Sequence, residues 1–253
     1  MTYFQFLLYF LVAPIVVLLL LSRRHLTRYR WLTIGALMAI ALIYTTPWDN
    51  YLVANEIWWY SPSQVTGLTL GWVPIEEYTF FLLQPLFTGL LLLTLRRFDP
   101  PQGPLKWGNR PANRWILALV ALWGTSIAVL LFGSTSTTYL GLELSWALPP
   151  LILQLAFGGE LLLGAFRSAG LALVGSTLYF TLADVVAIEA GIWTIHPSYT
   201  LGLNPLPSLV LEEAVFFALT NALVIGGLTL LWHPDSASRW SSLKDHWLGS
   251  RRA

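Results

Sequence analysis

Seven apolar segments follow one another through this chain, each close to the roughly 20 residues that a membrane-crossing helix needs. They cover residues 3–21, 31–47, 75–95, 115–132, 146–166, 168–188 and 209–232. Only 11% of the residues are charged, against about 25% in a typical soluble domain. So little charge leaves no room for a sizeable soluble domain. The sequence therefore predicts an all-α integral membrane protein with about seven transmembrane helices.

The basic residues all fall on one side of these predicted spans. They occupy the connections after the first, third and fifth spans and the tail after the seventh: Arg23, Arg24, Arg28, Arg30, Arg96, Arg97, Lys106, Arg110, Arg114, Arg167, Arg239, Lys244, Arg251 and Arg252. Short loops rich in Lys and Arg stay in the cytoplasm. We therefore predict a multi-pass protein of the cell membrane, with its N-terminus outside and its C-terminus in the cytoplasm.

An internal repeat divides the chain, at an offset of 135 residues and then, after one inserted residue, 136. The aligned pairs are Asp49 and Asp184, Trp58 and Trp193, Pro62 and Pro197, Gly67 and Gly202, Glu76 and Glu212, Glu77 and Glu213, Phe80 and Phe216, and Phe81 and Phe217. Three spans reverse the direction of the chain and a fourth restores it, so the two repeats run parallel. We predict a first three-helix repeat at 1–97, a linker with a connecting transmembrane helix at 98–143, a second three-helix repeat at 144–232 and an amphipathic cytoplasmic tail at 233–253.

Two adjacent glutamates open the third predicted span, in VPIEEYTFF, and again the seventh, in VLEEAVFF. Asp49 and Asp184 end the second and sixth spans at the same level. Six candidate catalytic carboxylates therefore gather at the outer edge of the hydrocarbon: Glu76, Glu77, Glu212, Glu213, Asp49 and Asp184. The predicted topology puts no Lys or Arg on that side. An unpaired charge within the hydrocarbon costs up to about 3 kcal/mol, so we expect these acids to keep their protons.

Helix capping is the alternative interpretation of the glutamates. Acidic residues favour helix N-termini, where the dipole and the free N–H groups stabilise them, and Pro74 suits a first helical turn. Capping accounts for either pair taken alone. It accounts neither for the recurrence of E-E-x-x-F-F with an aligned aspartate nor for the clustering without cations. The pattern thus favours a proton donor beside an apolar phase.

Helical spacing separates the two glutamates of each pair. Glu77 shares a polar stripe with Gln84 and Thr88, and Glu213 shares one with Thr220. Glu76 and Glu212 instead share stripes with Phe80 and Phe216. The periodicity predicts that the first glutamate faces an apolar pocket while the second supports it through polar partners.

Four aromatic residues cluster at the level of the acids: Trp58, Trp59, Tyr60 and Trp72. They can form the ordinary aromatic belt of a membrane interface, or stabilise a carbocation through their ring faces, which is worth up to about 2 kcal/mol when desolvated. The candidate substrate-binding residues are Phe80, Phe81, Phe216, Phe217, Trp58, Trp59, Tyr78, Gln84 and Asn221.

P-I-E-E-Y-x-F-F-x-x-Q, followed by a second E-E-x-x-F-F-x-x-T-N in a duplicated three-span unit, resembles the membrane-integral lycopene cyclases of carotenoid biosynthesis. The likeness covers both repeats, and this chain resembles the fused form of the family's two small subunits. The second motif departs from the pattern, since Val210 stands where the first motif has Pro74. The match therefore leaves open whether the second copy is catalytic or supporting.

The resemblance implies an intramolecular lyase, or isomerase, that turns the linear ends of lycopene into rings, β-ionone rings giving β-carotene. A carboxylic acid protonates a C=C, the carbocation cyclises, and a carboxylate removes a ring proton, with no net redox change. It implies a lipophilic polyene substrate in membrane lipid, no metal, no cofactor and no nucleic acid, with other carotenoid-pathway enzymes as further partners. The chain has no cysteine and no glycine-rich nucleotide fingerprint after a strand.

Three other classes fit less well. A retinal protein needs a Schiff-base lysine in a span, and both lysines lie outside the predicted spans. An intramembrane protease with an E-E-x-x-x-R helix would have arginine where this chain has Phe81 and Phe217. A proton-coupled transporter built from parallel repeats remains the alternative, because intramembrane acids and pseudo-symmetry suit it. Of the remaining acids, Glu160 is expected either to extend toward the membrane surface or to pair with Arg167, and Glu143 and Glu189 are expected at the surface.

Overall fold

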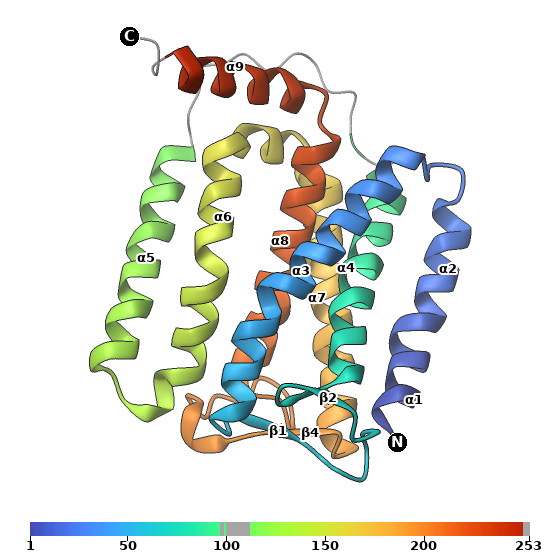
Figure 1. The fold of residues 1–253 in the computed structure, drawn as a ribbon, viewed down its shortest axis with the longest axis vertical. Coiled ribbons are helices and arrows are strands. Elements are labelled where there is room, and N and C mark those ends of the chain that lie inside the picture. Colours follow the sequence, from blue (N-terminus) through green and yellow to red (C-terminus); the bar gives the residue numbers. More distant parts are fainter. Residues whose placement is uncertain (97–98, 100–111, 250–253) are drawn as a thin grey trace.

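A computed structural model describes residues 1–96, 99 and 112–249 of the chain (Figure 1). Seven helices in the described part are long and apolar enough to cross a membrane, as predicted. Their bounds are Tyr3–Ser22, Arg28–Ala54, Ile75–Leu95, Asn113–Phe132, Thr135–Gly164, Phe166–Glu189 and Leu211–Trp232. The basic residues 97, 106, 110, 251 and 252 lie outside the described part of the chain.

The first span consists of α1 (Tyr3–Leu7), a π-helical turn η1 (Leu8–Val12) and α2 (Ala13–Ser22). It is followed by α3 (Arg28–Ala54) and α4 (Ile75–Leu95). After α5 (Ala112–Phe132) and a short 3₁₀ turn η3 (Thr135–Thr137), the chain forms α6 (Thr138–Gly164), α7 (Phe166–Glu189) and α8 (Leu211–Trp232). α4, α7 and α8 pack together at the centre, and α5 packs against α6 at the edge (Figure 1).

Two of these helices are longer than predicted. α3 continues past Pro47 to Ala54, so Asp49 lies within the helix instead of at its end. α6 begins at Thr138 and contains Pro149 and Pro150, so Glu143 lies within a span and is fully buried. The prediction of a surface position for Glu143 is therefore wrong, whereas Glu189 is exposed as expected. The predicted boundary at residues 143 and 144 falls inside α6, and the division into two repeats stays a prediction.

Short strands close the end of the bundle that carries the N-terminus (Figure 1). β1 (Trp58–Tyr60) pairs antiparallel with β4 (Trp193–Ile195), and Trp59 lies opposite Thr194. These two residues are also equivalent under the offset of 135. β2 (Thr69–Leu70) and β3 (Val73–Pro74) form a hairpin, and a 3₁₀ turn η4 (Pro197–Tyr199) follows β4.

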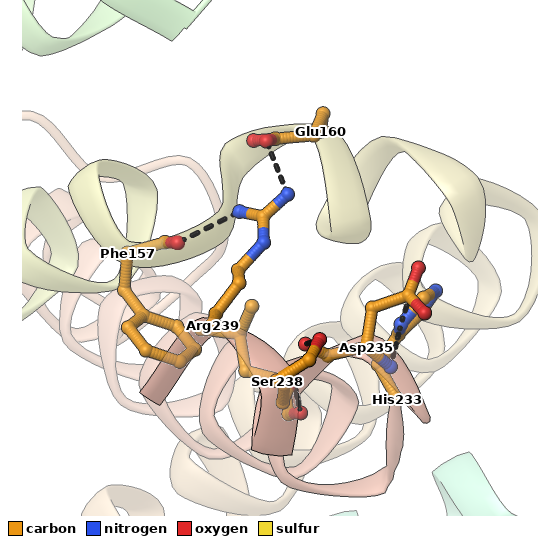
Figure 2. A network of polar contacts seen from close by, with 8 residues as sticks. Phe157, Glu160, His233, Asp235, Ser238 and Arg239 are labelled. Atoms are coloured by element: carbon orange, nitrogen blue, oxygen red, sulfur yellow. Dashed lines mark hydrogen bonds and ion pairs between the residues drawn. The ribbon is translucent and has the colours of Figure 1, made fainter. Parts of the chain in front are cut away.

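The opposite end of the bundle is covered by α9 (Asp235–Gly249), which lies across it (Figure 1). The tail therefore contains a helix, and its side chains at 243 and 245–249 are outside the described residues. Arg239 of α9 points into a bend of α6, where Gly158 leaves the helical conformation (Figure 2). Its guanidinium donates to the Phe157 carbonyl oxygen at 2.8 Å and forms an ion pair with Glu160. Glu160 thus pairs with Arg239, where pairing with Arg167 was one of two expectations.

Candidate active site

A small cavity of about 40 Å³ lies at the N-terminal ends of α4 and α8, beneath the β1–β4 pair. α3, α4, α6, α7 and α8 all contribute side chains to it, together with the start of α1. Its lining consists of Tyr3, Trp48, Asp49, Trp58, Tyr60, Glu77, Phe80, Phe81, Tyr139, Asp184, Trp193, Ile195, Glu213, Phe216 and Phe217. Four carboxylates thus share one aromatic chamber, with no Lys or Arg among the described residues that line it.

A tyrosine hydroxyl holds one glutamate of each pair in this chamber. Tyr3 donates to Glu77 Oε2 at 2.5 Å, and Tyr139 donates to Glu213 Oε1 at 2.6 Å. The two tyrosines are 136 residues apart, as the two glutamates are. The same hydrogen bond therefore occurs once in each half of the chain. A carboxyl group fixed in this way keeps one oxygen directed by the tyrosine and the other available to the cavity.

The other glutamate of each pair faces a loop. Glu76 Oε1 accepts from the Thr66 backbone N–H at 2.7 Å, and Glu212 Oε1 accepts from the Leu201 backbone N–H at 2.7 Å. Both carboxylates are fully buried, and neither lines the cavity. The prediction that the first glutamate faces the pocket and the second supports it is therefore wrong: the roles of the two positions are exchanged.

Glycine makes these two loops possible. Gly67 and Gly202 follow directly on the residues that donate to the glutamates, with φ of +80° and +69°. Side chains with a Cβ rarely adopt this left-handed conformation. The aligned glycines of the repeat therefore shape the turns that present an N–H group to a buried acid.

The two aspartates differ in their surroundings. Asp184 Oδ1 accepts from the Trp193 indole N–H at 2.9 Å. Asp49 is fully buried beside the Trp58 indole, the equivalent of Trp193 in the repeat, but no hydrogen bond of normal geometry joins the two among the described residues. Both line the cavity, as α3 and α7 end at the same level. The predicted convergence of Asp49 and Asp184 on Glu77 and Glu213 is what the geometry shows.

Tyr60 adds a further hydroxyl from β1, outside the membrane-spanning helices. Burial, and then the nearby carboxyls of Asp49 and Glu77, raise the pKa of the Tyr60 phenol well above its ordinary value. Tyr60 therefore stays neutral and can donate a hydrogen bond to an acid in the cavity. Its ring stacks on that of Tyr3, with centroids 6.2 Å apart.

Aromatic rings wall the remainder of the chamber. The rings of Trp48 and Phe216 are stacked and nearly parallel, with centroids 5.8 Å apart and an interplanar angle of 2°. Phe80 and Phe217 meet edge to face at 6.3 Å, and Trp48 meets Trp58 edge to face at 5.6 Å. Ring faces of this kind carry negative electrostatic potential that favours a cation. The four predicted phenylalanines and Trp58 are thus brought together.

Four predicted substrate-binding residues lie elsewhere. Trp59 is 40% exposed on β1 and packs against His196. Tyr78 donates to the Leu70 carbonyl oxygen at 2.7 Å and so braces the β2–β3 hairpin. Gln84 donates to Asn221 Oδ1 at 2.9 Å, which joins α4 to α8 below the chamber. Asn221 is buried in this interface. Gln84 also lines a second cavity next to the chamber.

Several residues of the chamber were not identified from the sequence: Tyr3, Trp48, Tyr139, Trp193 and Ile195. Tyr3 and Tyr139 could have been found, because they are aligned at the offset of 136 that relates the glutamates. Trp48 was missed because the predicted span ended at residue 47, which placed Trp48 in a loop.

A second cavity of about 170 Å³ continues from the first along α8, between α3 and α6. The two share Phe80, Phe81 and Phe216. Across its outer end, Tyr44 donates to the Trp146 carbonyl oxygen at 2.8 Å and stacks on the Trp146 ring. Gln154 connects it to a third cavity of about 830 Å³, which Trp232 and Trp240 line beneath α9. Three cavities with shared lining residues thus follow one another from the acids along α8.

Within the described residues, no group of three or more His, Cys, Asp or Glu has the arrangement of a metal site. The acids of the chamber converge on a space bounded by aromatic rings and tyrosine hydroxyls. Such an arrangement can deliver and accept protons in an apolar environment.

Comparison with known proteins indicates the family to which the chain belongs. Residues 1–95 match the family model described as Lycopene cyclase. A protein of Halobacterium salinarum named lycopene beta-cyclase is 42% identical over 206 residues, which is 80% of this chain and 83% of the relative. The chain belongs to the lycopene cyclase family. It is an enzyme of that family.

Fungi contain longer proteins that are similar to this chain. A bifunctional lycopene cyclase/phytoene synthase of Leptosphaeria maculans is 35% identical over 228 residues, 85% of this chain and 39% of the relative. One of Podospora anserina is 33% identical over 212 residues, 80% of this chain and 35% of the relative. The similarity therefore reaches into the second half of the chain, beyond the residues of the family model. No solved structure matches the chain.

Proposed function

We propose that this chain is a lycopene β-cyclase, which closes the linear ends of lycopene into β-ionone rings without net oxidation or reduction. One observation carries the proposal: two glutamates, each held by a tyrosine hydroxyl, face one aromatic cavity. The relatives named lycopene beta-cyclase support the choice of substrate. They are enzymes, which favours this reading over a proton-coupled transporter.

The reaction uses the carboxyls of the chamber as acid and base. A neutral carboxyl group protonates the terminal C=C of the polyene, which leaves a tertiary carbocation. An internal double bond attacks this cation and the six-membered ring closes. A carboxylate on the other side of the chamber then removes a ring proton. Glu77 and Glu213 are suited to these two steps, since each presents one oxygen to the cavity beside its tyrosine.

The aromatic walls stabilise the positive charge between the two proton transfers. Trp48, Trp58 and the phenylalanines surround the site at which the cation forms, and each desolvated ring face contributes up to about 2 kcal/mol. The walls also keep water away. This prevents water from trapping the cation as an alcohol.

The cavities along α8 accommodate the remainder of the substrate. From Glu213 to Leu231, α8 rises by about 27 Å at 1.5 Å per residue, and the three cavities follow it. An extended polyene of about 30 Å therefore lies with one end among the acids and the other near α9. The Tyr44–Trp146 contact lies over the lateral route between α3 and α6.

The acids lie on the outer side of the membrane in this proposal. The described basic residues of the α2–α3 and α6–α7 connections and of α9 lie at the opposite end of the bundle (Figure 1), and that end faces the cytoplasm by the positive-inside rule. The chain has no cysteine of its own. A cysteine introduced at Ser63 is therefore expected to react with an impermeant thiol reagent outside intact cells, and one at His25 is not.

Expression in lycopene-accumulating cells tests the function. Pigment chromatography is expected to show lycopene replaced by a compound of the same mass, with a blue-shifted spectrum. In heavy water, one deuterium enters each ring formed, because the proton of the donor acid exchanges with solvent. Unchanged lycopene in the presence of folded, membrane-inserted protein would exclude the proposal.

A further inference from the structure

Glu143 is a buried acid that the reaction described above does not use. It is fully buried in the second turn of α6, near enough to the Tyr139 hydroxyl to interact with it, but neither of its carboxyl oxygens makes a hydrogen bond of normal geometry among the described residues. It does not line the aromatic chamber. A buried carboxyl without such a bond is costly to retain, so its presence calls for an explanation.

The neighbours of Glu143 connect it to the chamber. Tyr139 lies one helical turn before it on the same face of α6, and Tyr139 in turn donates to Glu213 Oε1 at 2.6 Å. The carboxyls of Glu213 and Glu212, both on α8, are close enough to Glu143 to interact with it electrostatically. The Tyr139 hydroxyl therefore lies within reach of both Glu143 and Glu213, and Glu143 is not among the residues that line the cavity.

The first half of the chain lacks this acid. The offset of 136 that relates Tyr3 to Tyr139 and Glu77 to Glu213 places Leu7 opposite Glu143. Leu7 is buried among apolar residues of the core. The two tyrosine–glutamate pairs are therefore alike, but only Tyr139 is followed by an acid one helical turn later on its own helix.

We propose that Glu143 is a proton reserve that recharges Glu213 through the Tyr139 hydroxyl, which makes Glu213 the acid that protonates the polyene. This inference rests on the proposed function. Glu143 touches neither substrate nor cavity, so it acts through Tyr139 and is not itself a catalytic residue. Glu77, whose tyrosine is followed by Leu7 one helical turn later, is then suited to be the base.

The proton transfers balance. After Glu213 has given its proton to the C=C, the Glu143 O–H bond breaks as its proton passes to the Tyr139 oxygen. At the same time the original Tyr139 proton passes to the Glu213 carboxylate. Glu213 is neutral again and Glu143 is a carboxylate, which takes up one proton from the outer water. The proton removed from the ring leaves through the base to the same water, so each ring costs no net proton.

The Glu143→Gln variant tests the reserve, because it removes the transferable proton and keeps the size of the side chain. The variant is reconstituted in lipid vesicles and its product is followed by chromatography under two conditions. With enzyme in excess over lycopene, the first ring is expected to form within about threefold of the wild-type rate, because Glu213 starts protonated. With lycopene in excess, the steady-state rate is expected to fall at least about tenfold, and the one-ring intermediate accumulates.

Two controls complete the experiment. Glu189→Gln makes the same chemical change in an exposed acid at the same end of the bundle and is expected to leave both rates unchanged. Glu143→Leu places the side chain of the first half in the second half, and is expected to reproduce the loss in steady state while eluting as a folded species in detergent.

Each outcome has a distinct meaning. Wild-type rates under both conditions for Glu143→Gln would overturn the reserve, and so would an equal loss of the single-turnover and steady-state rates. A wild-type protein that forms no ring would instead overturn the proposed function itself.

Discussion

The acid sites of the two halves are built alike where they meet the cavity and differently behind it. In each half a tyrosine at the start of a helix donates to the second glutamate, and a loop N–H group donates to the first. The differences lie further out: Asp184 accepts a well-formed indole hydrogen bond whereas the contact of Asp49 with Trp58 is looser, and Glu143 stands opposite Leu7. The shared contacts fix the geometry of two carboxyls, and the unshared surroundings allow them to take different roles.

Removal of the acidic proton from either cavity glutamate is expected to have the largest effect. Glu77→Gln and Glu213→Gln are each expected to lower the rate of ring formation at least about 100-fold, as for the loss of a general acid or base. Pigment chromatography at equal amounts of inserted protein measures the rate. Full activity in one of the two variants would mean that only one half carries the chemistry.

The next largest effect is expected from the aspartates, and it differs in size between them. Asp184→Leu leaves the Trp193 indole N–H without its acceptor and is expected to lower the free energy of unfolding by about 1–3 kcal/mol. Asp49→Leu removes a fully buried carboxyl that has no hydrogen bond of normal geometry among the described residues, and it is expected to lower the free energy of unfolding by less than Asp184→Leu. Thermal unfolding in detergent compares the two variants. Equal destabilisation would show that the two aspartates are held in the same way.

The smallest effect is expected where the halves are most alike. Glu76→Ala and Glu212→Ala each remove the acceptor of one loop N–H group and are expected to cost about 1 kcal/mol of stability. Glu76→Gln and Glu212→Gln keep an acceptor oxygen and are expected to retain most activity, unlike the changes at Glu77 and Glu213. If Glu76→Gln lowered the rate of ring formation as much as Glu77→Gln, the first glutamate would also have a catalytic role.

The sequence predicted well what depends on composition and on repetition. Long apolar runs and one-sided basic residues gave the seven spans, because a helix in lipid must satisfy its own backbone groups. The repeat located the six carboxylates. Four of them, Asp49, Glu77, Asp184 and Glu213, line one cavity.

What could not be predicted depends on neighbours that are distant in the sequence. Pro47 suggested the end of a helix, but in a packed bundle the helix continues past it to Ala54. Periodicity separated Glu76 from Glu77 correctly but could not tell which face the loop before α4 covers. That loop folds back over Glu76 and offers it the Thr66 N–H group, which leaves Glu77 to the cavity. Glu143 was misplaced because α6 begins earlier than its hydropathy suggested.

The β1–β4 pair limits how such a chain can change over generations. It joins the two halves through backbone hydrogen bonds, with Trp59 opposite Thr194, and backbone groups are the same whatever side chain is attached. Substitutions in either strand therefore leave the joint intact, and the two halves are free to diverge from a common ancestor. An inserted or deleted residue would shift the register by one and turn Trp58 and Trp193 away from the acids. We expect related chains to differ in the residues of these two strands and to conserve the length of each strand.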